Sequence, residues 1–460
     1  MNKLTFTTEI KESKYLHVYE NENIYALYHA YYMNVVYLNK SSFATFNNLK
    51  KHKTLEDFCH VNPDLNKNKI LSLFESLFQN GIITTYNNRE RIDSAYIKNH
   101  SNIDIQIMYL IVTDSCNLKC KYCYIENSIP EDAKKVFMTE DLVSKSIDLF
   151  SKISKKNRRI IFYGGEPFLN KKTLKKGISY AREILKNDVE LSIITNASDI
   201  TKEDASFLEK HNVQISISID GNKDITDSVR PFISGKGTYS SIQKSVKNLR
   251  DAGISNISAS VTIGKHNYRT LKDQTKHLMT EFNFNSFGFN FLIDFPKTVN
   301  PQSVDIAIAT KSLLETFEFL RKNGLYEDRI MRKLKPFVEK KLYQKDCGAI
   351  GNQIVITPDG LIGPCQGFLY NKEYYSSELW DAEKISIDSS FKEWSKRYPL
   401  NMPECTNCEA IAICGGGCAY QAKISSDSLW SLDKRMCTHN KILLEWIIWD
   451  MYKNIKKNWL

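Results

Sequence analysis

Three cysteines stand close together at positions 116, 120 and 123, in the stretch CNLKCKYCY. Closely spaced cysteines bind zinc, form disulfides or hold iron–sulfur clusters. A structural zinc site takes four ligands, whereas the cysteine that follows this stretch in the chain is the distant Cys347. A four-iron cluster takes one thiolate for each iron, so three thiolates leave one iron open to a substrate or cofactor. The spacing C-x3-C-x2-C therefore favours a cluster with one open iron.

A second group of seven cysteines lies towards the end of the chain. It consists of Cys347, Cys365, a run in the spacing C-x2-C-x5-C-x3-C, and a final Cys437; the run is Cys405, Cys408, Cys414 and Cys418. This region is rich in Cys, Gly and Pro and poor in long periodic runs, so we expect metal crosslinks to hold it together. Zinc-ribbon pairing is the alternative. The lone Cys59 is typical of a small buried apolar residue.

Composition places the chain among globular proteins of two or three domains, with 460 residues, 42% hydrophobic and 25% charged. It has no run of 18 or more apolar residues, so we expect no membrane span. The start MNKLTFTTEIKESKY lacks the features of a secretory signal, which favours the cytoplasm, where clustered cysteines act as metal ligands more often than as disulfides. The net charge is +10, but Lys and Arg alternate with Asp and Glu along most of the chain. We therefore expect a solvated surface and no nucleic-acid groove.

Strand and helix patterns alternate between about residue 105 and residue 300. Six apolar stretches are typical of buried strands: IQIMYLIVT, RRIIFYG, ELSIITN, VQISISID, ISASVTI and FGFNFLI. Amphipathic stretches such as TEDLVSKSIDLFSKI separate them. The alternation predicts parallel strands with right-handed crossovers, and six units are too few for a closed eight-fold barrel. We therefore expect an α/β fold with a partial (β/α)6 TIM-like barrel, and CNLKCKYCY at its mouth after the first strand.

The two ends of the chain have other patterns. Near the N-terminus, strand-like IYALYHAYYMNVVYLN and helix-like KNKILSLFESLFQN precede the strand-like IITT, which predicts a winged-helix-like module, with a polar linker over 94–104. At the C-terminus, KILLEWIIWDMYKNIKKNWL has apolar residues near helical spacing, and we expect a helix packed on the barrel rather than membrane attachment. The expected units are the N-terminal module over 1–100, the barrel over 101–300, a bridging helical region over 301–346, a Cys-rich iron–sulfur domain over 347–440 and a C-terminal helix over 441–460.

Three more short motifs follow the expected strands in order: GGEP at 164–167, TNA at 195–197 and SIDG at 218–221. With C-x3-C-x2-C, whose last cysteine follows an aromatic residue, this order resembles the radical S-adenosylmethionine (SAM) superfamily. Ala197 departs from that pattern, which usually has glycine there. The resemblance implies that SAM binds the open iron and is held partly by the backbone of GGEP. The implied SAM-binding residues are Tyr122, Gly164, Gly165, Glu166, Pro167, Asn196, Ser218 and Arg230.

The seven later cysteines resemble the SPASM domain, which binds two auxiliary [4Fe–4S] clusters. The resemblance implies an outer group that holds one cluster completely, made of Cys405, Cys408, Cys414 and Cys437. It implies an inner group of three, made of Cys347, Cys365 and Cys418. Some relatives have an additional cysteine shortly before this motif. The stretch KPFVEKKLYQKDC has no cysteine before Cys347, so the inner cluster is left with three thiolates. The implied cofactors are SAM and three [4Fe–4S] clusters.

The resemblance also implies a reaction. Reduced by a donor such as flavodoxin or ferredoxin, the first cluster would cleave SAM to a 5′-deoxyadenosyl radical, which abstracts hydrogen from a substrate. Two auxiliary clusters would carry an electron away, which favours an oxidative product. Because SPASM enzymes most often act on peptides, we expect a maturase that forms a cross-link (carbon–carbon, ether or thioether) in a ribosomally made precursor peptide. The N-terminal module would bind the leader of that peptide as an added strand.

The sequence is also compatible with two alternative functions. An oxidase of the anaerobic sulfatase-maturing type would turn a Cys or Ser side chain into an aldehyde, but that family has Asp where this chain has Gln366. A non-catalytic electron-transfer or sensor protein is the other. The sequence names no general base, and Asp359 and Gln366 are the candidates that it offers.

Overall fold

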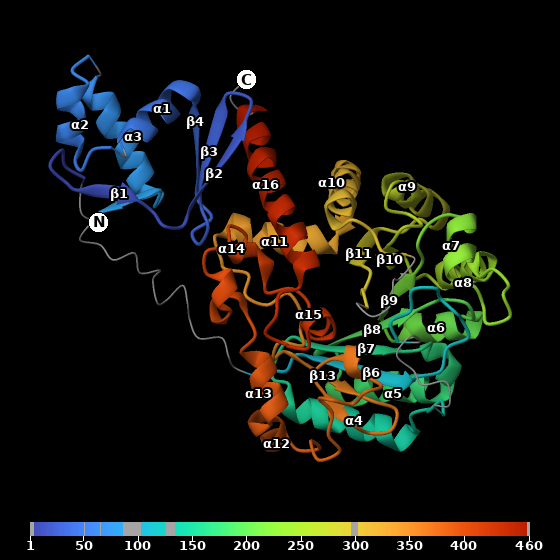
Figure 1. Ribbon diagram of the computed structural model, residues 1–460. Helices are drawn as coiled ribbons and strands as arrows, with labels where there is room; N and C mark the ends of the chain where they lie inside the picture. Colours follow the sequence, from blue (N-terminus) through green and yellow to red (C-terminus); the bar gives the residue numbers. More distant parts are fainter. Residues whose placement is uncertain are drawn as a thin grey trace.

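The computed structural model describes residues 4–49, 51–64, 66–85, 103–125, 134–295 and 302–457. Within these ranges the main body is a nine-stranded sheet in the order β12-β11-β10-β9-β8-β7-β6-β13-β14 (Figure 1). The strands β6 to β11 lie where the sequence predicts them, and each pairs in parallel with its neighbour. Their bounds are β6 Ile107–Thr113, β7 Arg158–Gly164, β8 Val189–Thr195, β9 Val213–Ser218, β10 Ile257–Ile263 and β11 Ser286–Phe291. The expected parallel α/β sheet is confirmed.

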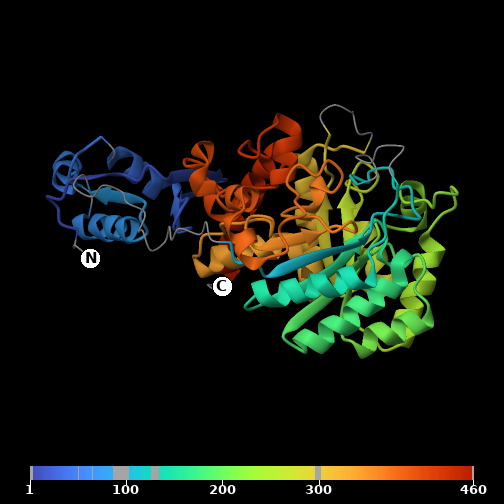
Figure 2. The ribbon, with the colours of Figure 1, turned by 90° about the horizontal axis from the view of Figure 1, so that it is seen from below.

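Helices link these strands and, in Figure 2, the teal and green ones lie along one side of the sheet. The first of them begins after Thr139, whose side chain accepts a hydrogen bond from the backbone N–H of Leu142. It buries Val143, Ile147 and Phe150, which recur at the helical spacing that packs one face on the sheet. The bounds are α4 Glu140–Ile153, α5 Lys171–Leu185, α6 Lys202–Lys210, α7 Lys223–Val229, α8 Tyr239–Asp251 and α9 Leu271–Phe282.

The Cys-rich region adds strands to the main sheet, which the sequence did not predict. β13 (Gln353–Ile356) runs parallel to β6, with Gln353 opposite Ile107, and β14 (Ile362–Gly363) pairs antiparallel with β13. At the other edge, β12 (Tyr326–Glu327) runs parallel to β11. The pairing of β13 with β6 places the residues around this hairpin beside the strand that leads into the first cysteine group.

The remaining helices, α10 to α16, follow β11 in the chain and include those of the Cys-rich region. The last one begins at Lys434 rather than near 441, so it includes Cys437. It packs against α10 and buries Leu443, Ile447 and Ile448, and none of the described helices is long and apolar enough to cross a membrane. The bounds are α10 Ile306–Lys322, α11 Asp328–Glu339, α12 Ala382–Ile387, α13 Ser389–Ser395, α14 Ile411–Cys414, α15 Ala419–Ser426 and α16 Lys434–Lys457, with 3-10 turns η2 Pro167–Asn170, η3 Gln366–Phe368, η4 Pro399–Asn401 and η5 Pro403–Cys405.

The N-terminal module has its own core and stands against α16 in Figure 1. The Tyr37 hydroxyl donates to the carbonyl of Ile448, and that of Tyr31 donates to the carbonyl of Thr406 at 3.0 Å. Cys59 is buried in this core, as expected. Most of the expected linker, 94–102, lies outside the described residues. The module consists of β1 Ile10–Glu12, β2 Leu16–Asn21, β3 Ile24–His29, β4 Val35–Asn39, α1 Lys40–Leu49, α2 Leu55–Val61, α3 Lys67–Gln79 and β5 Ile83–Thr85, with sheets β2-β3-β4 and β1-β5.

A buried carboxyl group gives the fold a pH dependence that can be measured. Glu327 caps α11 and accepts from the backbone N–H groups of Arg329 at 2.9 Å and Ile330 at 2.7 Å. Burial nevertheless raises the pKa of Glu327 from 4.5 to about 7. The folded chain therefore keeps a proton that the unfolded chain releases, and the free energy of unfolding falls by about 3 kcal/mol as the pH rises through this interval.

We expect Glu327→Gln to remove this contribution. The difference in the free energy of unfolding between variant and wild type should shift in favour of the variant by up to about 3 kcal/mol between pH 5 and pH 8. Urea unfolding at both pH values measures it. Asp328→Asn, which changes the half-exposed neighbour that pairs with Arg332, is the control, and the same pH dependence in Glu327→Gln as in the wild type would contradict the assignment.

Candidate active site

The first cysteine group lies at the carboxyl end of β6, as predicted, where ligands bind in parallel α/β folds. Burial raises the pKa of the Cys116 thiol to about 12, and the nearby thiols of Cys120 and Cys123 add to the rise. Burial likewise raises the pKa of the Cys120 thiol to about 11, with Cys123 again contributing. The three thiols thus act on one another electrostatically, as side chains gathered around one site do.

The donor set fits an iron–sulfur cluster. Buried thiols with raised pKa values bind metal only by releasing their protons, and four-iron clusters are bound by thiolates. In the part of the chain that the structure describes, no three His, Cys, Asp or Glu side chains converge on a single metal ion. A cluster does not require such convergence, because each thiolate binds a different iron.

The GGEP loop lies directly against the cysteine loop. The backbone N–H of Gly165 donates to the carbonyl of Thr113 at 2.9 Å, and that of Glu166 donates to the carbonyl of Ser115 at 2.8 Å. Gly164 has a φ of +146°, and a methyl group there would lie 2.1 Å from the Thr113 carbonyl oxygen. Both glycines are therefore required for the close approach of the two backbones.

This close approach makes Gly165→Ala a sharp test of the loop. The added methyl group would lie 2.2 Å from the carbonyl oxygen of Ser115, and relieving such a contact costs about 1–3 kcal/mol. We expect SAM binding to the iron-loaded protein to weaken about tenfold or more, measured by calorimetry. Gly288→Ala, at a β11 position with no atom within 4 Å of the added group, is the matched control. Equal affinities for the two variants would show that the loop does not hold SAM.

The side chain of Glu166 makes its hydrogen bonds to other residues of the protein. The carboxylate is buried and accepts from the Thr195 hydroxyl at 2.7 Å and from the backbone N–H groups of Asn196 at 2.7 Å and Phe168 at 3.1 Å. It thereby ties the loop after β7 to the loop after β8. Pro167 begins the short turn η2 that follows. The contribution of GGEP at the mouth consequently comes from its backbone.

The TNA loop reaches the cysteines from the next strand. The Asn196 side chain donates to the Asn117 side-chain oxygen at 3.0 Å and to the Cys116 sulfur at 3.9 Å. Ala197 has a φ of +52°, a left-handed conformation that favours glycine. This explains in physical terms why glycine is usual at this position of the motif, and alanine here holds the same turn with some strain.

A buried polar network joins the SIDG loop to the cysteine loop. The hydroxyl of Tyr122 donates to Asp220 and accepts from Arg230 at 2.7 Å. Asp220 is fully buried and also accepts from the backbone N–H of Thr262 at 2.8 Å. The ring of His266 stacks on Tyr122 at 5.6 Å. Arg230 therefore lies at the mouth, as the motif order predicts, next to a residue that the sequence analysis missed.

Asp220 could have been found from the sequence, because it stands inside the quoted motif. The predicted residue of this motif, Ser218, is the last residue of β9 and lies two positions before Asp220. A carboxylate at a strand end is a stronger signal than a hydroxyl, since it must be paired when it is buried.

The inner group comes together around the β13–β14 hairpin. Cys347 precedes β13, Cys365 follows β14 and Cys418 caps α15. Burial raises the pKa of the Cys365 thiol well above its usual range, and the thiols of Cys347 and Cys418 add to the rise. These three side chains therefore lie near one another; that they hold one cluster stays a prediction.

Partly buried tyrosines lie near both the inner group and the first group. Burial raises the pKa of Tyr124 well above its usual range, and both Cys365 and Cys123 contribute to the rise. The Tyr124 and Tyr163 hydroxyls are 3.3 Å apart, and the Tyr163 ring meets that of Tyr109 edge to face at 5.9 Å. A cluster of aromatic side chains thus lies beside both cysteine sites.

The outer group closes around α14 and the start of α16. Burial raises the pKa of the Cys405 thiol to about 12, to which the other three thiols of the group add. The chain then turns sharply through Gly415, Gly416 and Gly417, with φ values of +70°, +86° and +66°, which glycine alone adopts routinely. The Asn440 side chain donates to the Cys414 sulfur at 3.2 Å.

The two candidate bases are placed differently. Asp359 lies on the turn between β13 and β14, pairs with Lys372 at 3.2 Å and is half exposed. Gln366 follows Cys365 directly and accepts from the Gln353 side chain at 3.2 Å. Of the two, Gln366 is the residue next to the cysteine site, and an amide has no proton-accepting strength comparable with that of a carboxylate.

Residues 110–276 match the family model described as the Radical SAM superfamily. This segment is a radical SAM domain. The resemblance drawn from the motif order is thereby confirmed, and the matched segment runs from β6 into α9. Members of this superfamily bind SAM at a [4Fe–4S] cluster. The three cysteines, GGEP, TNA and SIDG all fall inside the segment.

Comparison with known proteins extends the likeness beyond the radical SAM domain. The chain is 23% identical to the radical SAM cyclopropyl synthase TigE of Paramaledivibacter caminithermalis over 97% of each chain. It shares its fold with anSMEcpe, solved with bound AdoMet, at a TM-score of 0.63 and 20% identity over 77% of this chain and 100% of that one. It also shares its fold with Streptococcus suis SuiB bound to the precursor peptide SuiA, at a TM-score of 0.56 and 15% identity over 93% of this chain and 99% of that one.

Proposed function

We propose that this radical SAM protein matures a ribosomally made precursor peptide by forming an oxidative cross-link (carbon–carbon, ether or thioether). The observation that carries the proposal is the sorting of ten cysteines into sets of three, three and four, which influence one another's pKa values. The first set lies at the mouth of the sheet, and β13 brings the inner set beside it.

The first set would hold a cluster with SAM on its open iron, and this pair supplies hydrogen-atom abstraction from an unactivated C–H bond. The protein's own residues would orient the cofactor and shield its site from water. The backbone of GGEP is fixed on the cysteine loop through Thr113 and Ser115, while Tyr122, Asp220 and Arg230 fix the opposite side. The aromatic side chains of Tyr124 and Tyr163, whose hydroxyls are 3.3 Å apart, would limit the access of water to the two sites.

Formation of a cross-link requires an acceptor for one electron. The peptide loses two hydrogens, one as an atom and the other as a proton with an electron left behind. Cys347, Cys365 and Cys418 would hold an auxiliary cluster that takes this electron, and the outer group would hold a second cluster that passes it on. A flavodoxin or ferredoxin would supply the first site with its reducing electron.

The N-terminal module would bind the leader of the precursor. Its antiparallel sheet β2-β3-β4 has edge strands to which a peptide strand can add. The module touches the loop after Cys405 through Tyr31, so a leader bound there leaves the rest of the peptide attached close to the cluster sites. SuiB, which shares the fold over nearly its full length, was solved with its precursor peptide.

A second product follows from the likeness to TigE. That protein is a cyclopropyl synthase and matches this chain from end to end. Closing a three-membered ring within one residue also removes two hydrogens from the peptide. Aldehyde formation of the sulfatase-maturing type also removes two hydrogens at a Ser side chain, whereas at a Cys side chain it exchanges sulfur for oxygen as well. Gln366 does not supply the base that such an oxidase uses.

The experiment is co-expression with short peptides encoded beside the gene, followed by tandem mass spectrometry. We expect a precursor that has lost two hydrogens and does not react with a carbonyl-trapping hydrazide. A cross-link between residues suppresses backbone fragments between them, whereas a ring inside one residue leaves the fragments intact. Failure of the iron-loaded protein to cleave SAM with dithionite would refute the proposed enzyme.

A further inference from the structure

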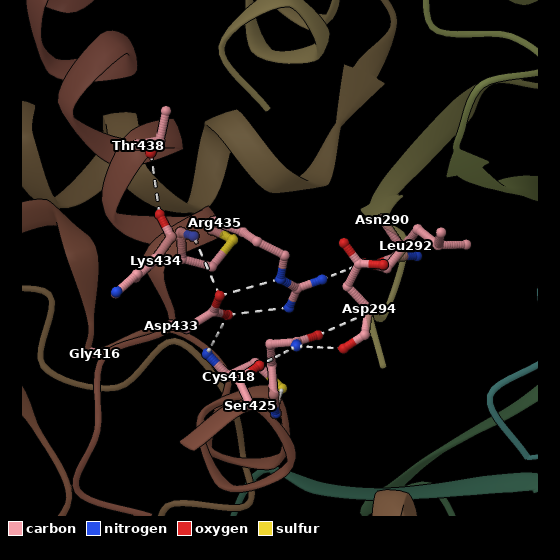
Figure 3. Close-up of polar contacts among 12 residues, drawn as sticks. Asn290, Leu292, Asp294, Gly416, Cys418, Ser425, Asp433, Lys434, Arg435 and Thr438 are labelled. Carbon is pink, nitrogen blue, oxygen red and sulfur yellow. Dashed lines mark hydrogen bonds and ion pairs between the residues drawn. The ribbon is translucent and has the colours of Figure 1, made fainter. Parts of the chain in front are cut away.

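A charged pair, Asp433 with Arg435, lies beside Cys418 of the inner cysteine group (Figure 3). Asp433 and Arg435 form two hydrogen bonds of 3.1 Å each, from the guanidinium to the two carboxylate oxygens. The Asp433 side chain is fully buried, and that of Arg435 is 13% exposed. A paired charge at such a place needs a reason, because replacing a buried pair by apolar groups costs little stability.

The pair is attached to the inner group and to the end of the barrel. The backbone N–H of Cys418 donates to Asp433 at 3.2 Å. Arg435 donates to the carbonyl of Leu292, just after β11. The pair therefore connects an inner-group cysteine with the carboxyl end of the last barrel strand, on the side of the sheet where substrate binds.

A second contact joins the same two segments. The Gln421 side chain accepts from the backbone N–H of Asp294 at 2.9 Å and donates to its carbonyl at 2.7 Å. The backbone N–H of Gln421 donates to the Cys418 sulfur at 3.5 Å. Figure 3 shows both contacts on one side of Cys418. With these anchors, Cys418 keeps a fixed position relative to the mouth.

The two charges of the pair act on Cys418 in opposite senses. The Asp433 carboxylate, which accepts from the Cys418 backbone N–H, repels negative charge there, and the Arg435 guanidinium paired with it attracts such charge. The same signs apply to any negative charge gained at this site. One-electron reduction of a bound cluster adds such a charge, so Arg435 favours the reduced form and Asp433 disfavours it.

We propose that Asp433 and Arg435 are positioning residues that set the reduction potential of the inner group and hold it against the end of β11. The inference rests on the proposed function, since it requires clusters at the later cysteines. In that setting the pair controls how readily the electron left by peptide oxidation enters the inner site. Neither residue touches the reacting atoms.

The test is a redox titration followed by electron paramagnetic resonance. The parent is a Cys116→Ala, Cys120→Ala, Cys123→Ala variant, so that the later cysteines alone contribute signals. In Arg435→Gln, one of the two midpoints should fall by about 59 mV, a tenfold change in a one-electron equilibrium. In Asp433→Asn, whose amide oxygen still accepts from Cys418, the same midpoint should rise. Arg321→Gln, which breaks a pair with Asp450 on the same helix α16, should leave both midpoints in place.

The outcomes separate the two proposals. A parent protein without iron would refute the cluster assignment itself and the inference with it. A parent with about eight irons whose midpoints do not move, or move in the same direction in both variants, would refute only the role of the pair. If Arg435→Gln loses about four irons, Arg435→Lys decides: retained iron supports a charge held at this place, and loss in both variants overturns the proposal.

Discussion

A protein in which Cys116, Cys120 and Cys123 are all replaced by alanine is expected to lose SAM cleavage completely. It should keep about eight of about twelve irons, because each cubane carries four. The reason is the separation seen in the structure: the three thiols act on one another at the end of β6, and the other seven form their own two sites. Iron analysis and chromatography of 5′-deoxyadenosine measure both effects.

Cys59→Ala is the control for this experiment. Cys59 is buried in the N-terminal core, away from the three groups, so its loss should leave the iron content and SAM cleavage unchanged. Residual SAM cleavage in the triple variant would place the reaction elsewhere. Loss of nearly all the iron would contradict the independence of the three sites.

Lys333→Met is expected to destabilise the protein by about 3–5 kcal/mol and to remove iron from both later sites. Lys333 is fully buried, pairs with Asp346 at 2.5 Å and donates to the carbonyl of Cys414 at 2.7 Å. Burial would raise the pKa of Asp346, but the charges of Lys333 and Arg332 outweigh it and hold that pKa at about 2. Removing the lysine leaves a buried carboxylate beside Cys347 without its main partner.

Two further variants identify the cause. Lys335→Met changes an exposed lysine on the same helix α11 and should behave like the wild type. Asp346→Leu in the Lys333→Met background removes the unpaired charge and should recover most of the stability, as apolar replacement of buried pairs does. Urea unfolding and iron analysis provide the two measurements. Equal stability of the two lysine variants would show that the pair has no structural role.

Much of the fold could be predicted because local pattern determines it. The parallel strands β6 to β11 are apolar or alternating segments of strand length, and α4 and α8 have apolar residues at helical spacing, so their identity depends on short-range properties. The last helix, α16, begins at Lys434, before the predicted start near residue 441. The sequence does not indicate this earlier start because Lys434 to Thr438 are mainly polar and form no apolar stripe. The helix there depends on packing around Cys437.

The cysteine groups illustrate the boundary between sequence and structure. The spacing of Cys116, Cys120 and Cys123 is enough to predict a three-thiol set, because it brings them together whatever surrounds them. The pairing of β13 with β6, which places Cys347 and Cys365 next to that set, arises only when the chain folds. Strand pairing between segments so far apart in the chain depends on packing, which no local pattern records.

The same reason explains the missed polar residues. Asp220, Lys333 and Arg435 look like ordinary surface residues in the sequence, since a charged side chain is normally solvated. Each is buried or nearly so here because the fold provides a partner from a distant segment: Tyr122, Asp346 and the end of β11. The spacing of the first cysteine group is a local property of the sequence, whereas the charges buried beside the cysteines depend on tertiary contacts, because burial makes an unpaired charge too costly to keep.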